Sequence, residues 1–106
     1  NFKEAVIHAA EGDTILSLKQ LTPVRLLKNN FYNKVQQAEQ KCASANELKE
    51  LLGRGRAKKG MFEGSLEEGE LEIGQVSATI KSIQPAADIV KEIWNEFEMV
   101  LKQPLK

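Results

Sequence analysis

The 106-residue sequence is poor in the residues on which many functions depend, with one cysteine, one histidine and one tryptophan. A single cysteine, Cys42, excludes an intrachain disulfide, and without a nearby set of Cys or His ligands it also argues against a metal site. Cysteine usage of this kind is typical of a reducing compartment. We therefore expect a cytoplasmic location and no bound metal.

An excess of charge of one sign is also lacking, because 15 basic residues balance 15 acidic ones. A nucleic-acid-binding domain normally carries a clustered basic excess, so we expect no nucleic-acid partner. The longest uncharged stretch, residues 73–80, is far shorter than the ~20 residues of a membrane-spanning helix, and no basic-then-apolar leader opens the chain. We expect no association with a membrane.

The length sets a further limit, because a chain of 106 residues has room for only a thin core. A complete (β/α)8 barrel needs about 250 residues, so this chain could only be a piece of one. It begins with Asn1 rather than Met, as a segment from the interior of a longer polypeptide would; a processed or tagged protein would begin in the same way.

Glycine and charge divide the chain into three parts. Six of the seven glycines lie in residues 53–74, where four basic residues at 54–59 precede five acidic residues at 63–72. This composition predicts a charged, glycine-rich loop, with the acidic part solvated and facing the basic part. Helices are expected on either side, over residues 1–52 and 75–103. The fold class is therefore mainly α, with four to five helices and little strand.

The spacing of apolar residues, together with glycine and proline at the expected helix ends, predicts the positions of the first helices. Apolar residues recur every four positions from Phe2, and Gly12 is typical of a helix stop, so we expect a helix over about 2–11. Thr22 followed by Pro23 is typical of a helix start, and an apolar stripe follows it, which predicts a helix at about 23–41. The stripe consists of Leu27, Phe31, Val35 and Ala38.

The later helices have clearer boundaries. Ser44 with Glu47 three residues on forms a capping box, and Gly53 ends the apolar pattern, so we expect a helix over 45–52. Helical spacing resumes at Gln75, and Pro85 breaks or restarts it. One apolar face then continues to near Pro104 through Ile89, Ile93, Phe97, Val100 and Leu101.

The residues that could carry chemistry have simpler structural interpretations. His8 has no paired Ser, Cys or Asp at a motif spacing, so we expect an exposed or half-buried helix histidine. We expect Cys42 to be a small buried filler, and Trp94 with Phe97 to belong to a core. Residues 55–60 have the glycine spacing of a phosphate-binding loop, but Met61 stands where its lysine is required. The residues alone therefore predict no catalytic set.

Three motifs in register carry a more specific signal. They read Thr22-Pro-Val-Arg-Leu-Leu-Lys-Asn29, Gly53-Arg-Gly-Arg-Ala-Lys-Lys-Gly-Met-Phe-Glu-Gly64 and Gly69-Glu-Leu-Glu-Ile-Gly-Gln-Val76. Together they resemble the C-terminal part of the nitronate monooxygenase family, formerly 2-nitropropane dioxygenases, which includes the flavin-dependent enoyl-acyl-carrier-protein reductase II. The resemblance extends from Asn1 to about Leu101.

This resemblance implies an FMN-containing TIM barrel that precedes residue 1, with the present chain as its helical subdomain. The family oxidises alkyl nitronates or passes electrons from NAD(P)H to an enoyl thioester. Its catalytic histidine and phosphate-binding glycines precede this part, so the chain by itself is expected to be inactive and to hold no cofactor. The missing barrel is the implied partner, and self-association through the apolar faces of 23–41 and 86–101 is expected without it.

Two local interpretations stay open at this point. By similarity, Gly74 and Gln75 come near the FMN of the parent; alternatively, Gly74 only starts a helix and Gln75 is a first-turn polar residue. Residues 53–64 could form a lid over the substrate channel, but we favour Met61 and Phe62 as contacts that pin this loop to the helices. The alternative to the oxidoreductase hypothesis is a stand-alone helical protein-interaction module.

Overall fold

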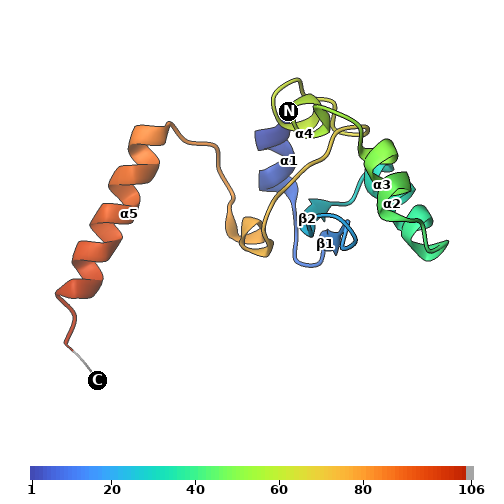
Figure 1. Cartoon of the computed structure of the whole chain (residues 1–106). Helices are drawn as coiled ribbons and strands as arrows, with labels where there is room; N and C mark the ends of the chain where they lie inside the picture. Colours follow the sequence, from blue (N-terminus) through green and yellow to red (C-terminus); the bar gives the residue numbers. More distant parts are fainter. Residues whose placement is uncertain (105–106) are drawn as a thin grey trace.

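The computed structural model describes residues 1–104, which form a small, mainly helical body with one hairpin, and one projecting helix (Figure 1). Five α-helices, one two-stranded hairpin and one 3-10 helix make up this part of the chain. The mainly helical fold class is confirmed. Helix α1 covers Phe2–His8, shorter than the expected 2–11, because Ala9 already adopts an extended conformation and Gly12 belongs to the following turn.

The hairpin occupies a region for which the sequence predicted a helix. Strand β1 (Thr14–Ser17) pairs antiparallel with β2 (Val24–Leu27), Thr14 opposite Leu27. The predicted helix at 23–41 is therefore wrong in its first third. The backbone groups of β2 bond to β1 on one edge and to residues 71–73 on the other, so Thr22 and Pro23 precede a strand and start no helix.

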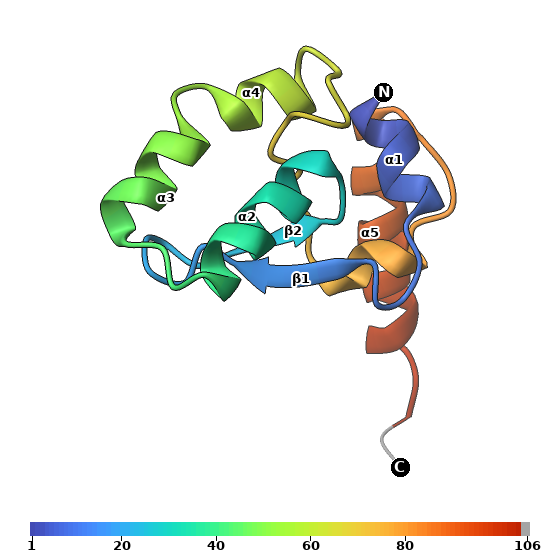
Figure 2. The same ribbon diagram turned by 90° about the vertical axis from the view of Figure 1, so that its right-hand side faces the viewer.

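Helix α2 (Asn30–Gln40) begins instead at a cap supplied by Asn29, whose side chain accepts a hydrogen bond from Tyr32 N at 2.8 Å. Its apolar stripe faces the core of the body, in which Phe31 and Val35 are fully buried. The remaining members of this core are Leu18, Leu26 and Leu48. Figure 2 shows α2 lying across the hairpin.

Helix α3 (Ala45–Leu52) confirms the predicted boundaries. Ser44 Oγ accepts a hydrogen bond from Glu47 N at 3.2 Å, and Gly53 ends the helix with a positive φ of 66°. The glycine-rich segment that follows contains a helix that the sequence did not predict, α4 (Arg56–Met61). The loop expected over 53–74 is therefore partly helical.

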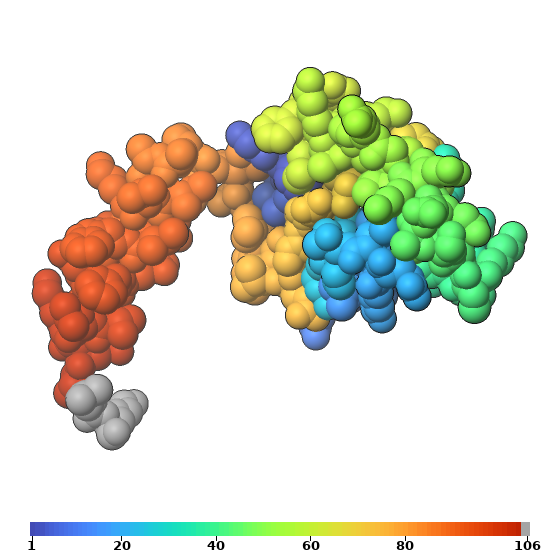
Figure 3. Space-filling view, in the orientation of Figure 1, coloured from blue at the N-terminus to red at the C-terminus, as the bar shows by residue number. Residues whose placement is uncertain are grey.

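The chain between Gly74 and Pro85 is less helical than the spacing from Gln75 predicted. A 3-10 helix, η1 (Gln75–Thr79), is followed by an extended linker over residues 80–85. Helix α5 (Ala86–Leu101) then begins directly after Pro85, which confirms that Pro85 interrupts and restarts the helical pattern. None of the residues of α5 is buried, and the space-filling view shows this helix as a separate arm (Figure 3).

The projecting arm expands the molecule. Its radius of gyration is 17.3 Å, whereas a compact domain of about 100 residues has a value of about 13 Å. Among residues 1–104, no helix is both long enough and apolar enough to cross a bilayer.

Candidate functional site

Gly74 and Gln75 lie at the end of a short extended segment that is added to the edge of β2. Leu27 N donates to Leu71 O at 2.9 Å, and Ile73 N donates to Arg25 O at 3.3 Å. The chain then turns, and Gly74 becomes the N-cap of η1 with Gln75 as its first residue. The interpretation that Gly74 starts a helical turn is therefore confirmed, while the expected proximity of Gly74 and Gln75 to FMN stays a prediction.

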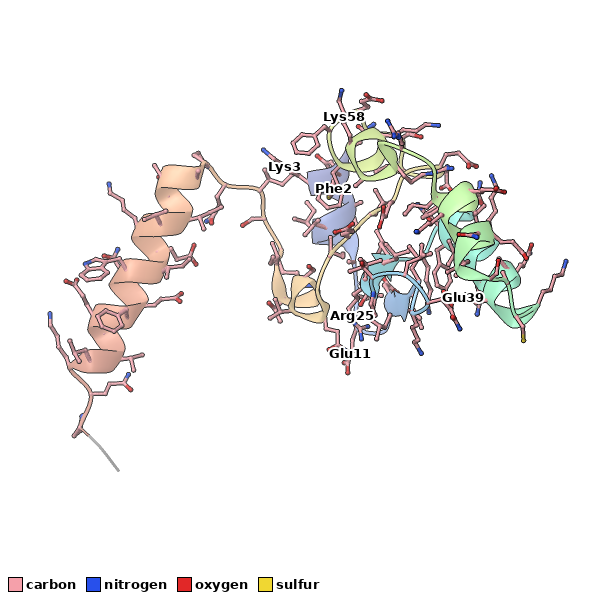
Figure 4. All side chains as sticks on the ribbon, in the orientation of Figure 1. Phe2, Lys3, Glu11, Arg25, Glu39 and Lys58 are labelled. Atoms are coloured by element: carbon pink, nitrogen blue, oxygen red, sulfur yellow. The ribbon has the colours of Figure 1, made fainter. Side chains whose placement is uncertain are left out.

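Both residues border an open hollow of about 690 Å³ between η1 and the turn that joins α1 to β1. Glu11 and Gly12 line its opposite side, and Figure 4 shows Glu11 beside η1. A side-chain carbon added at Gly74 would meet no atom within 4 Å, so the space above this residue is open. A backbone without a side chain, next to an exposed amide that both donates and accepts, can lie against a planar polar ring.

The residues weighed for catalysis lie apart from this hollow. His8 is exposed, as expected, with its Nδ1 2.7 Å from Glu4 O. Cys42 is exposed rather than buried, because it occupies a left-handed turn with φ 58° beyond the end of α2. Within residues 1–104, no group of three or more His, Cys, Asp or Glu side chains is placed to hold a metal ion.

The glycine-rich segment is attached to the body, but not by Phe62, one of the two residues that we expected to pin it. Phe62 is 83% exposed and only Met61 is partly buried, so pinning by Phe62 is wrong. Arg56 makes the attachment instead, donating to the carbonyl oxygens of Leu51, Leu52 and Glu68 at 2.8–3.0 Å. Its guanidinium also lies 4.7 Å from the centre of the Phe31 ring.

The sequence did not predict this structural role of Arg56. An arginine among glycines and lysines is typical of a solvated base, and only the folded chain brings three carbonyl oxygens around it. Arg56, one of the four basic residues at 54–59, instead connects α4 to the end of α3 and to the backbone of residue 68.

The acidic run is only partly solvated. Glu68 pairs with Lys34 at 2.7 Å, and Glu63 with Lys58 at 3.8 Å, so the basic and acidic parts do face one another at one point. Glu70, by contrast, is 6% exposed. Burial, followed by a hydrogen bond and charge repulsion from Glu72, raises the pKa of Glu70 to about 7. The expectation of a fully solvated acidic loop is therefore wrong at Glu70.

Apolar side chains that we expected to lie in a core are exposed on α5. Trp94 is 57% and Phe97 is 52% exposed, and their ring centres lie 5.3 Å apart. A second apolar surface adjoins α5, since α1, the linker and Ile89 border an open hollow of about 340 Å³. Its apolar lining includes Phe2, Val6, Ile7, Ile80 and Ile83.

Solved structures of known proteins contain a similar arrangement. No protein-family model matches the sequence, and no curated protein matches it. A solved structure of FabK from Thermotoga maritima superimposes with a TM-score of 0.79 at 28% identity, covering 95% of this chain. The chain resembles part of FabK.

FabK is an enoyl-ACP reductase II of the nitronate monooxygenase family, so the resemblance that the three motifs indicated is confirmed. A single-substitution mutant of Thermotoga maritima FabK matches with a TM-score of 0.71 at 26% identity, again over 95% of this chain. The chain spans about a third of FabK, 32% in the first structure and 29% in the second. The region of FabK outside this match is about twice as long as the match itself.

Proposed function

We propose that this chain is the C-terminal helical subdomain of an FMN-dependent oxidoreductase and is inactive by itself. The parent would be a cytoplasmic nitronate monooxygenase or an NAD(P)H-dependent enoyl-ACP reductase. The observation that carries the proposal is the match to FabK over 95% of this chain, at 28% identity and with a TM-score of 0.79.

The exposed apolar surface supports a missing partner region. The apolar residues of α5 span an arc of ~140° at about 100° per residue, which is wider than the narrow seam of a two-helix coiled coil. They are Ile89, Val90, Ile93, Trp94, Phe97, Val100 and Leu101, each more than 40% exposed. Exposed apolar patches of this width mark interaction sites. We propose that this face and the adjoining hollow beside α1 cover the barrel of the parent.

The residues at the end of the extended segment fit one edge of a flavin. Gly74 presents open backbone and Gln75 an exposed amide, beside a hollow open to the exterior. In the proposed parent, the Gln75 amide would hydrogen-bond to a polar ring atom, and Gly74 would allow that approach. FMN would supply the electron-transfer chemistry, and the barrel would hold its phosphate.

A chimaera tests this proposal directly. The matching third of Thermotoga maritima FabK is replaced by this chain, and the purified product is examined for its flavin absorption and for NAD(P)H-dependent enoyl reduction. We expect bound FMN, weakened when Gln75→Ala is introduced and retained in the control Gln20→Ala, an exposed position outside the hollow.

A second measurement covers the case in which the chimaera does not fold. The product of the complete reading frame is purified and titrated with FMN. A colourless protein that neither binds FMN nor gains activity from it would overturn the oxidoreductase proposal. It would favour the stand-alone interaction module, for which the exposed face of α5 would serve as the docking surface.

A further inference from the structure

Two carboxyl groups share one face of the extended segment that precedes Gly74. Residues 70 and 72 are two positions apart in this extended segment, and side chains two positions apart in an extended chain point to the same side. Glu72 lies opposite Leu26 of β2, and Glu70 N donates to Arg56 O at 3.0 Å. Both glutamates line one hollow of about 530 Å³, whose apolar walls are Leu18, Leu21, Val24 and Leu52.

The opposite face of the segment is held by apolar contact. Leu71 is 2% exposed, and its carbonyl oxygen accepts the hydrogen bond from Leu27 N. Burial of Leu71 therefore fixes one side of the segment. On the other side, the buried carboxyl group of Glu70 lies beside that of Glu72.

The neighbouring cations do not neutralise Glu70 through hydrogen bonds. Arg56 lowers the pKa of Glu70 by its charge, but its donors bond to three backbone carbonyl oxygens. Arg25 of β2 donates to Thr14 O. Lys49 of α3 borders the same hollow and is itself exposed, while Glu39 of α2 accepts from Leu18 N.

We propose that Glu70 and Glu72 form a proton-dependent latch. In the closed latch the protonated carboxyl group of Glu70 donates a hydrogen bond to the carboxylate of Glu72, and residues 70–73 are held against β2. Loss of that proton leaves two negative charges side by side, one of them buried, and loosens the segment. The latch concerns this chain alone and does not depend on the proposed oxidoreductase function.

The direction of the pH dependence follows from the raised pKa of Glu70. The folded state keeps the Glu70 proton up to about pH 7, whereas an unfolded chain releases it near the ordinary value of 4.5. The contribution to stability is therefore complete below about pH 4.5 and is lost as the pH rises to about 7. Between these values the folding equilibrium weakens by up to about tenfold per pH unit.

The latch is tested on the 106-residue chain by urea unfolding between about pH 5 and about pH 8. We expect the unfolding midpoint to fall up to about pH 7 and then to level off. Glu70→Gln keeps a hydrogen-bond donor without a titrating proton and removes this fall. Glu50→Gln, at an exposed position on α3, retains it. A midpoint that is independent of pH in the unmodified chain, or a fall that persists in Glu70→Gln, would overturn the proposal.

A second measurement needs no folded variant of Glu70. Carbon-13 NMR of the side-chain carboxyl groups follows Glu70 in the unmodified chain, where we expect titration near neutrality. In Glu72→Gln this titration moves toward lower pH, because the repelling charge is gone while burial remains. Hydrogen exchange at the Leu27 and Ile73 amides, corrected for pH, should rise over the same range. Titration of Glu70 in the ordinary range of glutamate would refute the latch.

Discussion

Gly60 of α4 and Gly69 of the following segment pack backbone against backbone. A side-chain carbon built at Gly69 would overlap Gly60 Cα, and one built at Gly60 would lie 2.7 Å from Leu71 Cδ2 and 3.0 Å from Glu70 O. Because neither residue has a side chain, α4 can approach residues 69–71 closely. This contact holds α4 against the extended segment that leads to Gly74.

Substitution of Gly69 by Ala should destabilise the chain, because the added carbon has no room beside the Gly60 backbone. Overpacking of this kind costs about 1–3 kcal/mol in the free energy of unfolding, measurable by urea denaturation. Gly74→Ala is the matched control, since Gly74 has a negative φ of −81° and open space above it. Equal stability of the two variants would show that the Gly60–Gly69 contact is loose.

Asn29→Ala should be more damaging than the loss of an ordinary helix cap. Asn29 accepts from Tyr32 N, and its Nδ2 donates to Leu66 O at 2.7 Å and to Gly69 O at 2.8 Å. A cap is worth about 1 kcal/mol, and each abandoned carbonyl adds to that cost, so we expect a loss of about 2–3 kcal/mol.

Two further variants separate the roles of Asn29. Asn29→Asp keeps the acceptor for Tyr32 N but loses both donors, so it should also destabilise the chain. Asn30→Ala, at an exposed neighbouring position, should change the free energy of unfolding by less than about 0.5 kcal/mol. A fully stable Asn29→Asp variant would mean that only the cap matters.

Cys42 should react with a thiol reagent in the folded chain. Its side chain is exposed and it is the only cysteine, so one thiol per chain should be modified. Because no unfolding step is required, the rate in buffer should be close to the rate in denaturing urea. Modification only after unfolding would show that the thiol is covered.

The isolated chain should self-associate through α5. Phe31 and Val35, from the other apolar stripe expected to associate, are fully buried in the core, so that stripe is not available. We expect the sedimentation coefficient to rise with concentration and this rise to be lost when Ile93 and Phe97 are both replaced by Glu. Met99→Glu is the control, because Met99 lies on the opposite side of α5 by helical spacing. A strictly monomeric chain at high concentration would contradict this prediction.

Local signals in the sequence determined α3 and the start of α5. The Ser44–Glu47 cap and Gly53 act within a few residues, and Pro85 restricts only its own neighbourhood. Such signals can be read from the sequence because where a helix starts or ends at these positions depends on residues that are adjacent in the chain. The three motifs likewise indicated the family of FabK, part of which the structure matches.

The remaining features depend on residues far apart in the chain. Val24–Leu27 forms a strand because β1 and residues 71–73 satisfy its backbone groups, whereas the Thr22–Pro23 signal records only local preference. Arg56 and Glu70 acquire their roles from carbonyl oxygens and burial that the fold assembles around them. The sequence by itself determined the apolar stripe of α5, since helical spacing places those residues on one side. Only the tertiary structure decided that this stripe stays exposed, because burial requires a second surface, and the body borders α5 at Ile89 without covering its apolar face.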